Sequence, residues 1–270
     1  KHMYVNLFDS HVHSDNSHDG EHSITFLCEN AQQKDLMGLC ITDHYEMELN
    51  EAQADICLRN SFIETGKSRQ AFDNRLLVMS GIELGQATRN FQKADRLLNR
   101  YRFDFVIGSL HCIRDMDDFA YIDFSGLNVE LILQRYFEEM LELCQWGGFD
   151  TLAHMTYPLR YIIGKYQIPV DMKPYEEIIR EILKTLADKN LALEINTAGL
   201  RREIGQTSPT LEYVKLFREL GGELLTFGSD AHRAQDLGAG LDVAIDMAKE
   251  AGFSHFAFYK KREPRMLRLM

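Results

Sequence analysis

The chain has 270 residues, of which 45% are hydrophobic and 26% charged, a balance typical of a folded domain and not of disorder or a coiled coil. The formal net charge is −11, and an acidic protein repels the phosphate backbone, so we do not expect nucleic-acid polymers among its partners. No apolar run approaches the ~20 residues of a membrane span, and no signal-peptide pattern opens the chain, so we expect a cytoplasmic protein with no membrane partner.

The start of the chain and the cysteines set two further expectations. Lys1 to Met3 resemble the remnant of an expression tag, and no linker-like segment follows, so we expect a single domain over residues 4–270. The 5 cysteines are scattered without a CxxC pair. We therefore expect reduced thiols and no disulfide framework.

Seven short apolar runs recur along the chain, and longer amphipathic segments separate them. In chain order the runs are Val5 to Phe8, Leu36 to Thr42, Leu76 to Ile82, Phe105 to Leu110, Phe149 to Ala153, Leu191 to Ile195 and Leu224 to Phe227. Such runs suit strands that are buried on both faces, as in a parallel sheet. Helices are expected between them, for example over Tyr175 to Ala187 and Thr210 to Leu220. The alternation predicts an α/β fold that closes, or nearly closes, into a barrel.

Each run leads into residues that bind metals or anchor polar groups. The candidates are His11, His13, Asp19, His44, Glu83, His111, His154, Asn196, Asp230 and His232. Because the carboxyl ends of parallel barrel strands meet on one face, we expect these side chains to converge there. A single histidine at such a position is more often structural than a ligand, but six histidines placed in this way favour a metal site.

The ligand types indicate which metals the site would take. Histidine nitrogens mixed with carboxylate oxygens suit zinc, manganese or iron better than calcium or magnesium. His11 and His13, two residues apart on an extended segment, point the same way and can hold one ion. The ligands outnumber what one ion accepts, which predicts a multinuclear centre with Glu83 as a bridge. Asp9 and Asp43 are expected either to orient ligand histidines or to cap a turn or helix.

These residues lie in motifs that resemble the polymerase and histidinol phosphatase superfamily, the PHP family. The motifs are HVHSDNSHDG at 11–20, ITDH at 41–44, GIELG at 81–85, GSLH at 108–111, AHMTYPLR at 153–160, INTAGLR at 195–201 and GSDAH at 228–232. The resemblance implies a distorted (β/α)7 barrel that binds three divalent transition-metal ions.

The resemblance also implies how the ligands are shared among the ions. The first ion would be held by His11, His13 and Asp230, the second by His111 and His154 with Glu83 bridging, and the third by Asp19, His44 and His232. His18 competes with Asp19 for the third ion.

Within the superfamily, the chain looks most like the histidinol-phosphate phosphatases of histidine biosynthesis. That likeness implies a phosphate monoester hydrolase in which a metal-bridging hydroxide attacks phosphorus. Arg160 and Arg201 are implied to bind the phosphate and, with Glu83, to be catalytic; Arg202 is the alternative to Arg201. Guanidinium groups beside divalent ions would give an acidic protein a positive pocket for a phosphate dianion.

Substrate choice is expected to involve the insert from Arg114 to Gly126. It mixes carboxylates with Phe119, Tyr121 and Phe124. These residues are predicted either to receive the imidazole and ammonium of histidinol phosphate, by charge pairing and cation–π contact, or to fold onto the barrel.

Other functions stay open at this point. A PHP phosphoesterase acting on nucleotides or other small phosphate esters fits the same motifs. A metal-dependent amidohydrolase commonly adds a bridging lysine, which no predicted strand end supplies. In a non-catalytic module the ions would only stabilise the barrel or recruit a partner, but structural zinc sites are usually closed and often rich in thiolates. We therefore favour an enzyme with a small-molecule substrate; nothing in the sequence indicates its oligomeric state.

Overall fold

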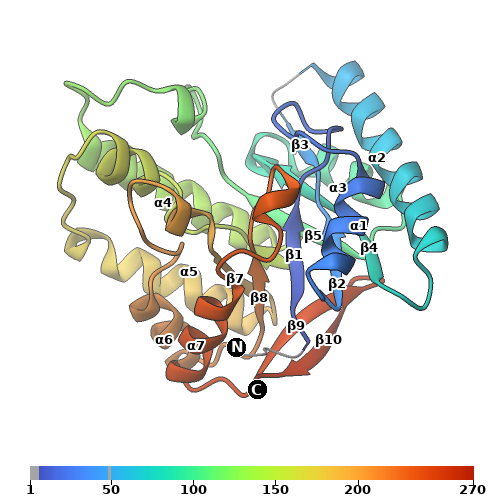
Figure 1. Ribbon diagram of the computed structural model, residues 1–270. Coiled ribbons are helices and arrows are strands. Elements are labelled where there is room, and N and C mark those ends of the chain that lie inside the picture. Colours follow the sequence, from blue (N-terminus) through green and yellow to red (C-terminus); the bar gives the residue numbers. More distant parts are fainter. Residues whose placement is uncertain (1–5, 48–49) are drawn as a thin grey trace.

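The computed structural model describes residues 6–47 and 50–270, so the expected tag remnant lies outside the described residues. Its centre is a parallel sheet in the order β1-β2-β4-β5-β6-β7-β8, with β3 paired to β4 (Figure 1). The strands are β1 (Phe8–Val12), β2 (Gly38–Ile41), β3 (His44–Glu46), β4 (Leu77–Gly85), β5 (Phe105–Ser109), β6 (Thr151–Leu152), β7 (Ala192–Asn196) and β8 (Leu225–Gly228).

The first and last strands of the sheet come together and nearly close it. A parallel bridge joins Val12, at the end of β1, to Ala231, just after β8. The amide of His13 donates to the carbonyl of Ala231 at 2.9 Å and continues this contact. The predicted distorted (β/α)7 barrel is therefore confirmed.

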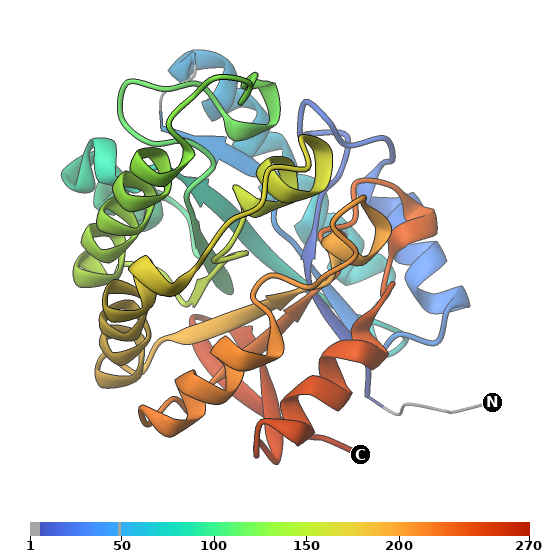
Figure 2. The same cartoon turned by 90° about the vertical axis from the view of Figure 1, so that its left-hand side faces the viewer.

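Helices lie outside the strands and cover the sheet (Figure 2). They are α1 (Ile24–Gln33), α2 (Glu51–Ala71), α3 (Phe91–Arg100), α4 (Val129–Trp146), α5 (Glu176–Asp188), α6 (Leu211–Glu219) and α7 (Leu241–Glu250). Shorter turns are η1 (Ala87–Arg89), η2 (Phe119–Tyr121), the π-helical η3 (Arg160–Lys165), η4 (Lys173–Tyr175), η5 (Ala198–Arg201) and η6 (Ala234–Asp236). Side-chain caps fix several starts: Ser23 accepts from the amide of Phe26 in α1, and Asn128 accepts from that of Leu131 in α4. No described helix combines the length and apolar character needed to cross a membrane.

An antiparallel hairpin of β9 (His255–Lys260) and β10 (Glu263–Arg268) covers the amino ends of the strands (Figure 1). Its aromatic residues stack on those of the barrel. The ring pairs are Phe8 with Phe258 and Phe227 with Phe256, each with centroids 4.5 Å apart, and Phe105 with Tyr259 at 5.1 Å.

Two strands differ from the predicted runs in a way that matters for the site. β1 was expected over Val5 to Phe8 but occupies Phe8–Val12, so His11 lies inside the strand. β4 was expected to end at Ile82 but continues to Gly85, which places Glu83 inside it. The apolar runs stop short here because both strands continue into buried polar residues, which an apolar pattern does not mark.

Candidate active site

Glu83, fully buried in β4, is the centre of the polar cluster at the carboxyl ends of the strands. Five histidines surround its carboxylate, each with a ring nitrogen close to one of its oxygens. Oε2 lies 3.1 Å from His11 Nε2, 3.2 Å from His13 Nε2 and 3.1 Å from His44 Nδ1, and Oε1 lies 3.1 Å from His111 Nε2 and 3.0 Å from His154 Nε2. The predicted convergence of the strand ends is therefore present.

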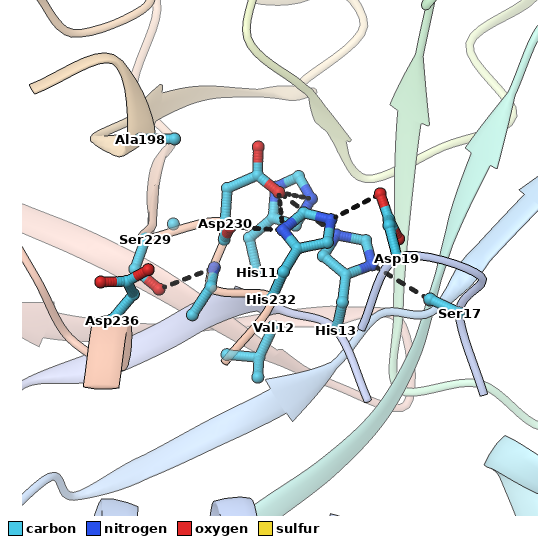
Figure 3. Close-up of polar contacts among 12 residues, drawn as sticks. His11, Val12, His13, Ser17, Asp19, Ala198, Ser229, Asp230, His232 and Asp236 are labelled. Carbon is cyan, nitrogen blue, oxygen red and sulfur yellow. Dashed lines mark hydrogen bonds and ion pairs between the residues drawn. The ribbon is translucent and has the colours of Figure 1, made fainter. Parts of the chain in front are cut away.

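Asp230 meets two of these histidines from the loop after β8. Its Oδ1 lies 3.4 Å from His11 Nε2 and 3.2 Å from His13 Nε2. Figure 3 shows His11, His13 and His232 gathered beside it. The backbone of Asp230 is left-handed, with φ at +56°, an uncommon conformation for a residue other than glycine that often occurs at functional sites.

A more exposed group lies beside the buried one. Asp19 stands between His232 Nε2, at 3.2 Å from its Oδ2, and His44 Nε2, at 3.5 Å from its Oδ1. The side chain of His18 is 57% exposed, and its Nε2 is 3.9 Å from Asp19. The geometry thus favours Asp19 over His18 as the residue shared by these two histidines.

Many of these close approaches are not hydrogen bonds, which makes the cluster a fit for metal ions. Among the described residues, the buried side-chain atoms without a hydrogen-bond partner are His11 Nε2, His13 Nε2, His44 Nδ1, Glu83 Oε2 and His154 Nδ1. Buried polar atoms are normally paired, so their concentration at one place calls for a further partner.

The ligand atoms also form overlapping groups, each compact enough for one ion. These groups are His11, His13, Glu83 and Asp230; His44, Glu83 and His111; and His13, His44 and His232, with the atoms of each within 4.8 Å of one another. Nitrogen and carboxylate donors in this mixture suit transition metals.

The electrostatics keep the acids ionised. Burial alone would raise the pKa of Glu83, but His11, His111 and His44 hold it well below its usual value. Burial, followed by the neighbouring His44 and His232, lowers the pKa of His13. Ionised carboxylates and a neutral His13 are the forms that bind metals. Burial would lower the pKa of His11, His44 and His111, but neighbouring carboxylates raise it well above the usual value, so a metal ion would displace protons from these rings.

Several ligand candidates are oriented by residues behind them. Glu194 in β7 lies 2.6 Å from His11 Nδ1 and accepts from the amide of His154 at 3.0 Å. Ser17 lies 3.3 Å from His13 Nδ1 and donates to Asp43, which thus orients His13 indirectly. Such contacts fix which ring nitrogen faces the ion.

Asp9 contacts the loop after β8, which neither of its expected roles included. Its carboxylate accepts from the amide and hydroxyl of Ser229 and from the amide of Gly238. It touches no histidine ring among the described contacts, so it fastens the loop that carries Asp230 to β1.

Sequence reasoning missed Glu194 and Glu46. Glu194 is a single acid within the apolar run Leu191 to Ile195, and that interruption was the available signal. Glu46 lies in the short strand β3, two residues after His44, and its Oε1 lies 2.8 Å from His111 Nδ1. No apolar run marks β3, so no sequence pattern indicated that Glu46 lies in the site.

A cavity of about 710 Å³ opens over this cluster. Arg160 lines it and is nevertheless only 6% exposed. Its guanidinium carbon lies 5.1 Å from the ring centroid of Tyr157, and Nη2 lies 3.8 Å from Asp230 Oδ2. The predicted phosphate-binding arginine thus sits at the edge of the candidate metal centre.

The two neighbouring arginines are arranged differently from each other. Arg201 donates to the carbonyl of Ser229 at 2.8 Å and lies 3.6 Å from Asp236. It lines an adjacent cavity of about 700 Å³, whereas Arg202 lines both cavities. A phosphate-binding role for Arg201 stays a prediction, and Arg202 is the residue that reaches the cavity over the cluster.

Different residues of the insert from Arg114 to Gly126 match each of its two expected roles. Phe119 and Phe124 are fully buried and fold onto the barrel. Asp117, Asp118 and the 76% exposed Tyr121 line the cavity. Asp118 also accepts a hydrogen bond from the hydroxyl of Tyr157 at 3.1 Å, which connects the insert to the wall beside Arg160.

Comparisons with known proteins find similarity along nearly the whole chain. The family model described as the PHP domain matches residues 9–198. A probable histidinol-phosphatase of Thermotoga maritima is 29% identical over 256 residues, which cover 95% of this chain and 97% of that protein. A histidinol-phosphatase of Lactococcus lactis is 28% identical over 257 residues, or 93% of each protein.

A solved structure extends the likeness to three dimensions. Histidinol phosphate phosphatase from Lactococcus lactis, in complex with zinc, L-histidinol and phosphate, matches with a TM-score of 0.82 at 26% identity. The match covers 97% of this chain and 99% of that one. The similarity therefore continues past residue 198, where the family match ends.

Proposed function

The chain belongs to the PHP-domain family, and we infer from this and from its site that it is a metal-dependent phosphate monoester hydrolase acting on L-histidinol phosphate. The observation that carries the inference is the convergence of five histidines on buried Glu83, with Arg160 at the edge of the same cavity. This arrangement combines metal ligands with a cation that can bind phosphate oxygens.

We assign three divalent ions to the cluster, with the ligands shared as the family motifs imply. The first belongs to His11, His13 and Asp230, the second to His111 and His154 with Glu83 shared between the two, and the third to Asp19, His44 and His232. The compact groups of ligand atoms differ from this sharing in two places: His44, not His154, lies with Glu83 and His111, and His13, not Asp19, lies with His44 and His232. When bound, such ions lower the pKa of a coordinated water towards ~7 and so supply a hydroxide nucleophile at neutral pH.

The protein's own groups prepare the phosphate. Arg160 is held between the ring of Tyr157 and the carboxylate of Asp230, so its guanidinium is in place before a substrate arrives. A guanidinium binds two phosphate oxygens at once and balances charge that builds on them during transfer. Burial of Arg160 limits competing water and strengthens this interaction.

Other residues of the cavity support a substrate with a cationic end. Asp117, Asp118, Tyr121 and Tyr161 line the cavity and are not among the ligand candidates. Histidinol phosphate carries a phosphate at one end and an ammonium and imidazole at the other, which complements Arg160 on one side and acidic and aromatic residues on the other. The curated relatives named histidinol-phosphatase support the same substrate.

The experiment strips the protein with a chelator and restores zinc, manganese or iron separately. Phosphate release is then measured with L-histidinol phosphate, nucleoside monophosphates and simple sugar phosphates. We expect activity only after metal is restored, with the highest kcat/KM for histidinol phosphate. Equal kcat/KM across the panel would leave a general phosphoesterase, and bound metal without phosphate release would indicate a non-catalytic metal-binding module.

A further inference from the structure

Glu46 contacts the side of the His111 ring that faces away from Glu83. Its Oε1 lies 2.8 Å from His111 Nδ1, while Nε2 on the other edge of the ring lies 3.1 Å from Glu83 Oε1. The same Oε1 is 3.3 Å from His44 Nδ1. The side chain of Glu46 is only 11% exposed, so water competes little for these contacts.

Gln86 holds both the carboxylate of Glu46 and the backbone of His111. Its side-chain amide donates to Glu46 Oε2, and its carbonyl oxygen Oε1 accepts from the amide of His111 at 2.8 Å. The backbone of Gln86 is left-handed, with φ at +57°, as the chain turns from β4 into η1. Both oxygens of Glu46 are therefore already engaged by neighbouring side chains.

Gly85 provides the space that Glu46 occupies. The two residues are paired in register between β3 and β4. A Cβ atom added at Gly85 would lie 2.1 Å from Glu46 Oε2 and 2.6 Å from its Cδ, so the carboxylate would have to move. The absence of a side chain at position 85 is thus a steric requirement for the contact between Glu46 and His111.

We propose that Glu46, seated on Gly85 and held by Gln86, is a positioning residue that prepares His111 to bind a metal ion. A carboxylate that accepts the Nδ1 proton fixes the tautomer with its lone pair on Nε2 and makes that nitrogen a better donor. Glu46 is assigned to act through His111, because it meets the Nδ1 edge of the ring while Nε2 on the other edge faces Glu83. The proposal rests on the proposed function for the presence of metal ions.

The test measures metal affinity directly, by chelator competition and by counting bound ions, and needs no substrate. Glu46→Ala should bind one ion of the set roughly 10–100-fold more weakly. Glu46→Gln, which keeps an acceptor oxygen, should recover part of that affinity. Glu142→Gln makes the same charge change at an exposed residue paired with Arg114 and should leave all ions bound as in the wild type.

A second variant disturbs the contact between Glu46 and His111 without changing any polar side chain. Gly85→Ala should weaken the same ion by displacing Glu46, whereas Gly66→Ala, where an added Cβ meets nothing within 4 Å, is the matched control. Unchanged affinity in both Glu46→Ala and Gly85→Ala would overturn the proposal.

A double-mutant cycle separates positioning from direct ligation. Because Glu46 acts through the ring of His111, Glu46→Ala should add little to the loss caused by His111→Ala. Fully additive losses would mean that Glu46 binds the ion itself or acts through the fold, and either result overturns the proposal.

The outcomes also separate this proposal from the proposed function. A wild-type protein that hydrolyses histidinol phosphate with metal bound, beside a Glu46→Ala variant of equal affinity, refutes the positioning role alone. Weakened metal binding in Glu46→Ala, in a protein with no phosphatase activity, refutes the proposed function alone. A wild-type chain that retains no ion refutes both.

Discussion

The two ends of the barrel bury opposite kinds of side chain. At the amino end, the hairpin stacks aromatic rings such as Phe258 on Phe8. In the part of the chain that the structure describes, no buried side-chain polar atom there lacks a hydrogen-bond partner, and Arg262 pairs with Asp150 at 2.6 Å. At the carboxyl end, Glu83 and its histidines are buried with several atoms unpaired. The difference implies that one end contributes stability and the other trades stability for chemistry. Substitutions at the two ends should therefore affect different properties.

The largest effect is expected from Glu83→Gln. This change removes the charge that five histidines surround, so the variant should lose bound metal together with turnover. Loss of metal forfeits several kcal/mol of transition-state stabilisation, which corresponds to about 10³-fold or more in kcat/KM. Metal analysis and phosphate release measured on the same sample check this. Retained metal and activity would show that the carboxylate does not bridge ions.

Arg160→Ala should come next and should separate phosphate binding from metal binding. Removing one preorganised donor typically costs about 10²–10³-fold in turnover. Because Arg160 is assigned to phosphate and not to a metal, the ion content should stay at the wild-type level. Loss of metal in Arg160→Ala would contradict the assignment.

The same assays on Arg201→Ala and Arg202→Ala would show which of these arginines binds phosphate together with Arg160. The cavity lining favours Arg202.

Phe258→Ala tests the opposite end. The ring is 8% exposed and stacks on Phe8, so truncation should lower the free energy of unfolding by about 3 kcal/mol. Turnover of the folded protein should not change, because the hairpin covers the end of the barrel away from the cavity. Denaturant unfolding and kcat at a temperature where the variant is folded give the two measurements. Met266→Ala, at a residue 46% exposed in β10, is the control. A reduced kcat in the folded variant would contradict the inference that the amino end of the barrel contributes stability and not activity.

The same contrast explains what the sequence could predict. The barrel and its convergent ligands follow from apolar runs that end in polar residues, since parallel strands deliver their carboxyl ends to one face. Glu194 was not predicted as a site residue because it lies inside such a run. Its burial depends on the contact with His11, which is remote in sequence. The choice between Arg201 and Arg202 could not be made from the sequence, because it depends on the tertiary structure: Arg202 lines both cavities, whereas Arg201 lines only the adjacent one.

The prediction with the smallest expected effect concerns the exposed part of the open end. Asp19 is 42% exposed, unlike buried Glu83, so water screens its charge. A charge interaction at such a position is on the order of 1 kcal/mol, so Asp19→Asn should bind the third ion about fivefold more weakly. Excess metal should restore its activity, whereas it should not restore that of Glu83→Gln. His18→Ala is the matched comparison, because its more exposed ring lies beside the same group, with Nε2 3.9 Å from Asp19. If His18→Ala weakens the third ion and Asp19→Asn does not, His18 is the ligand and the shared position of Asp19 has no part in holding metal.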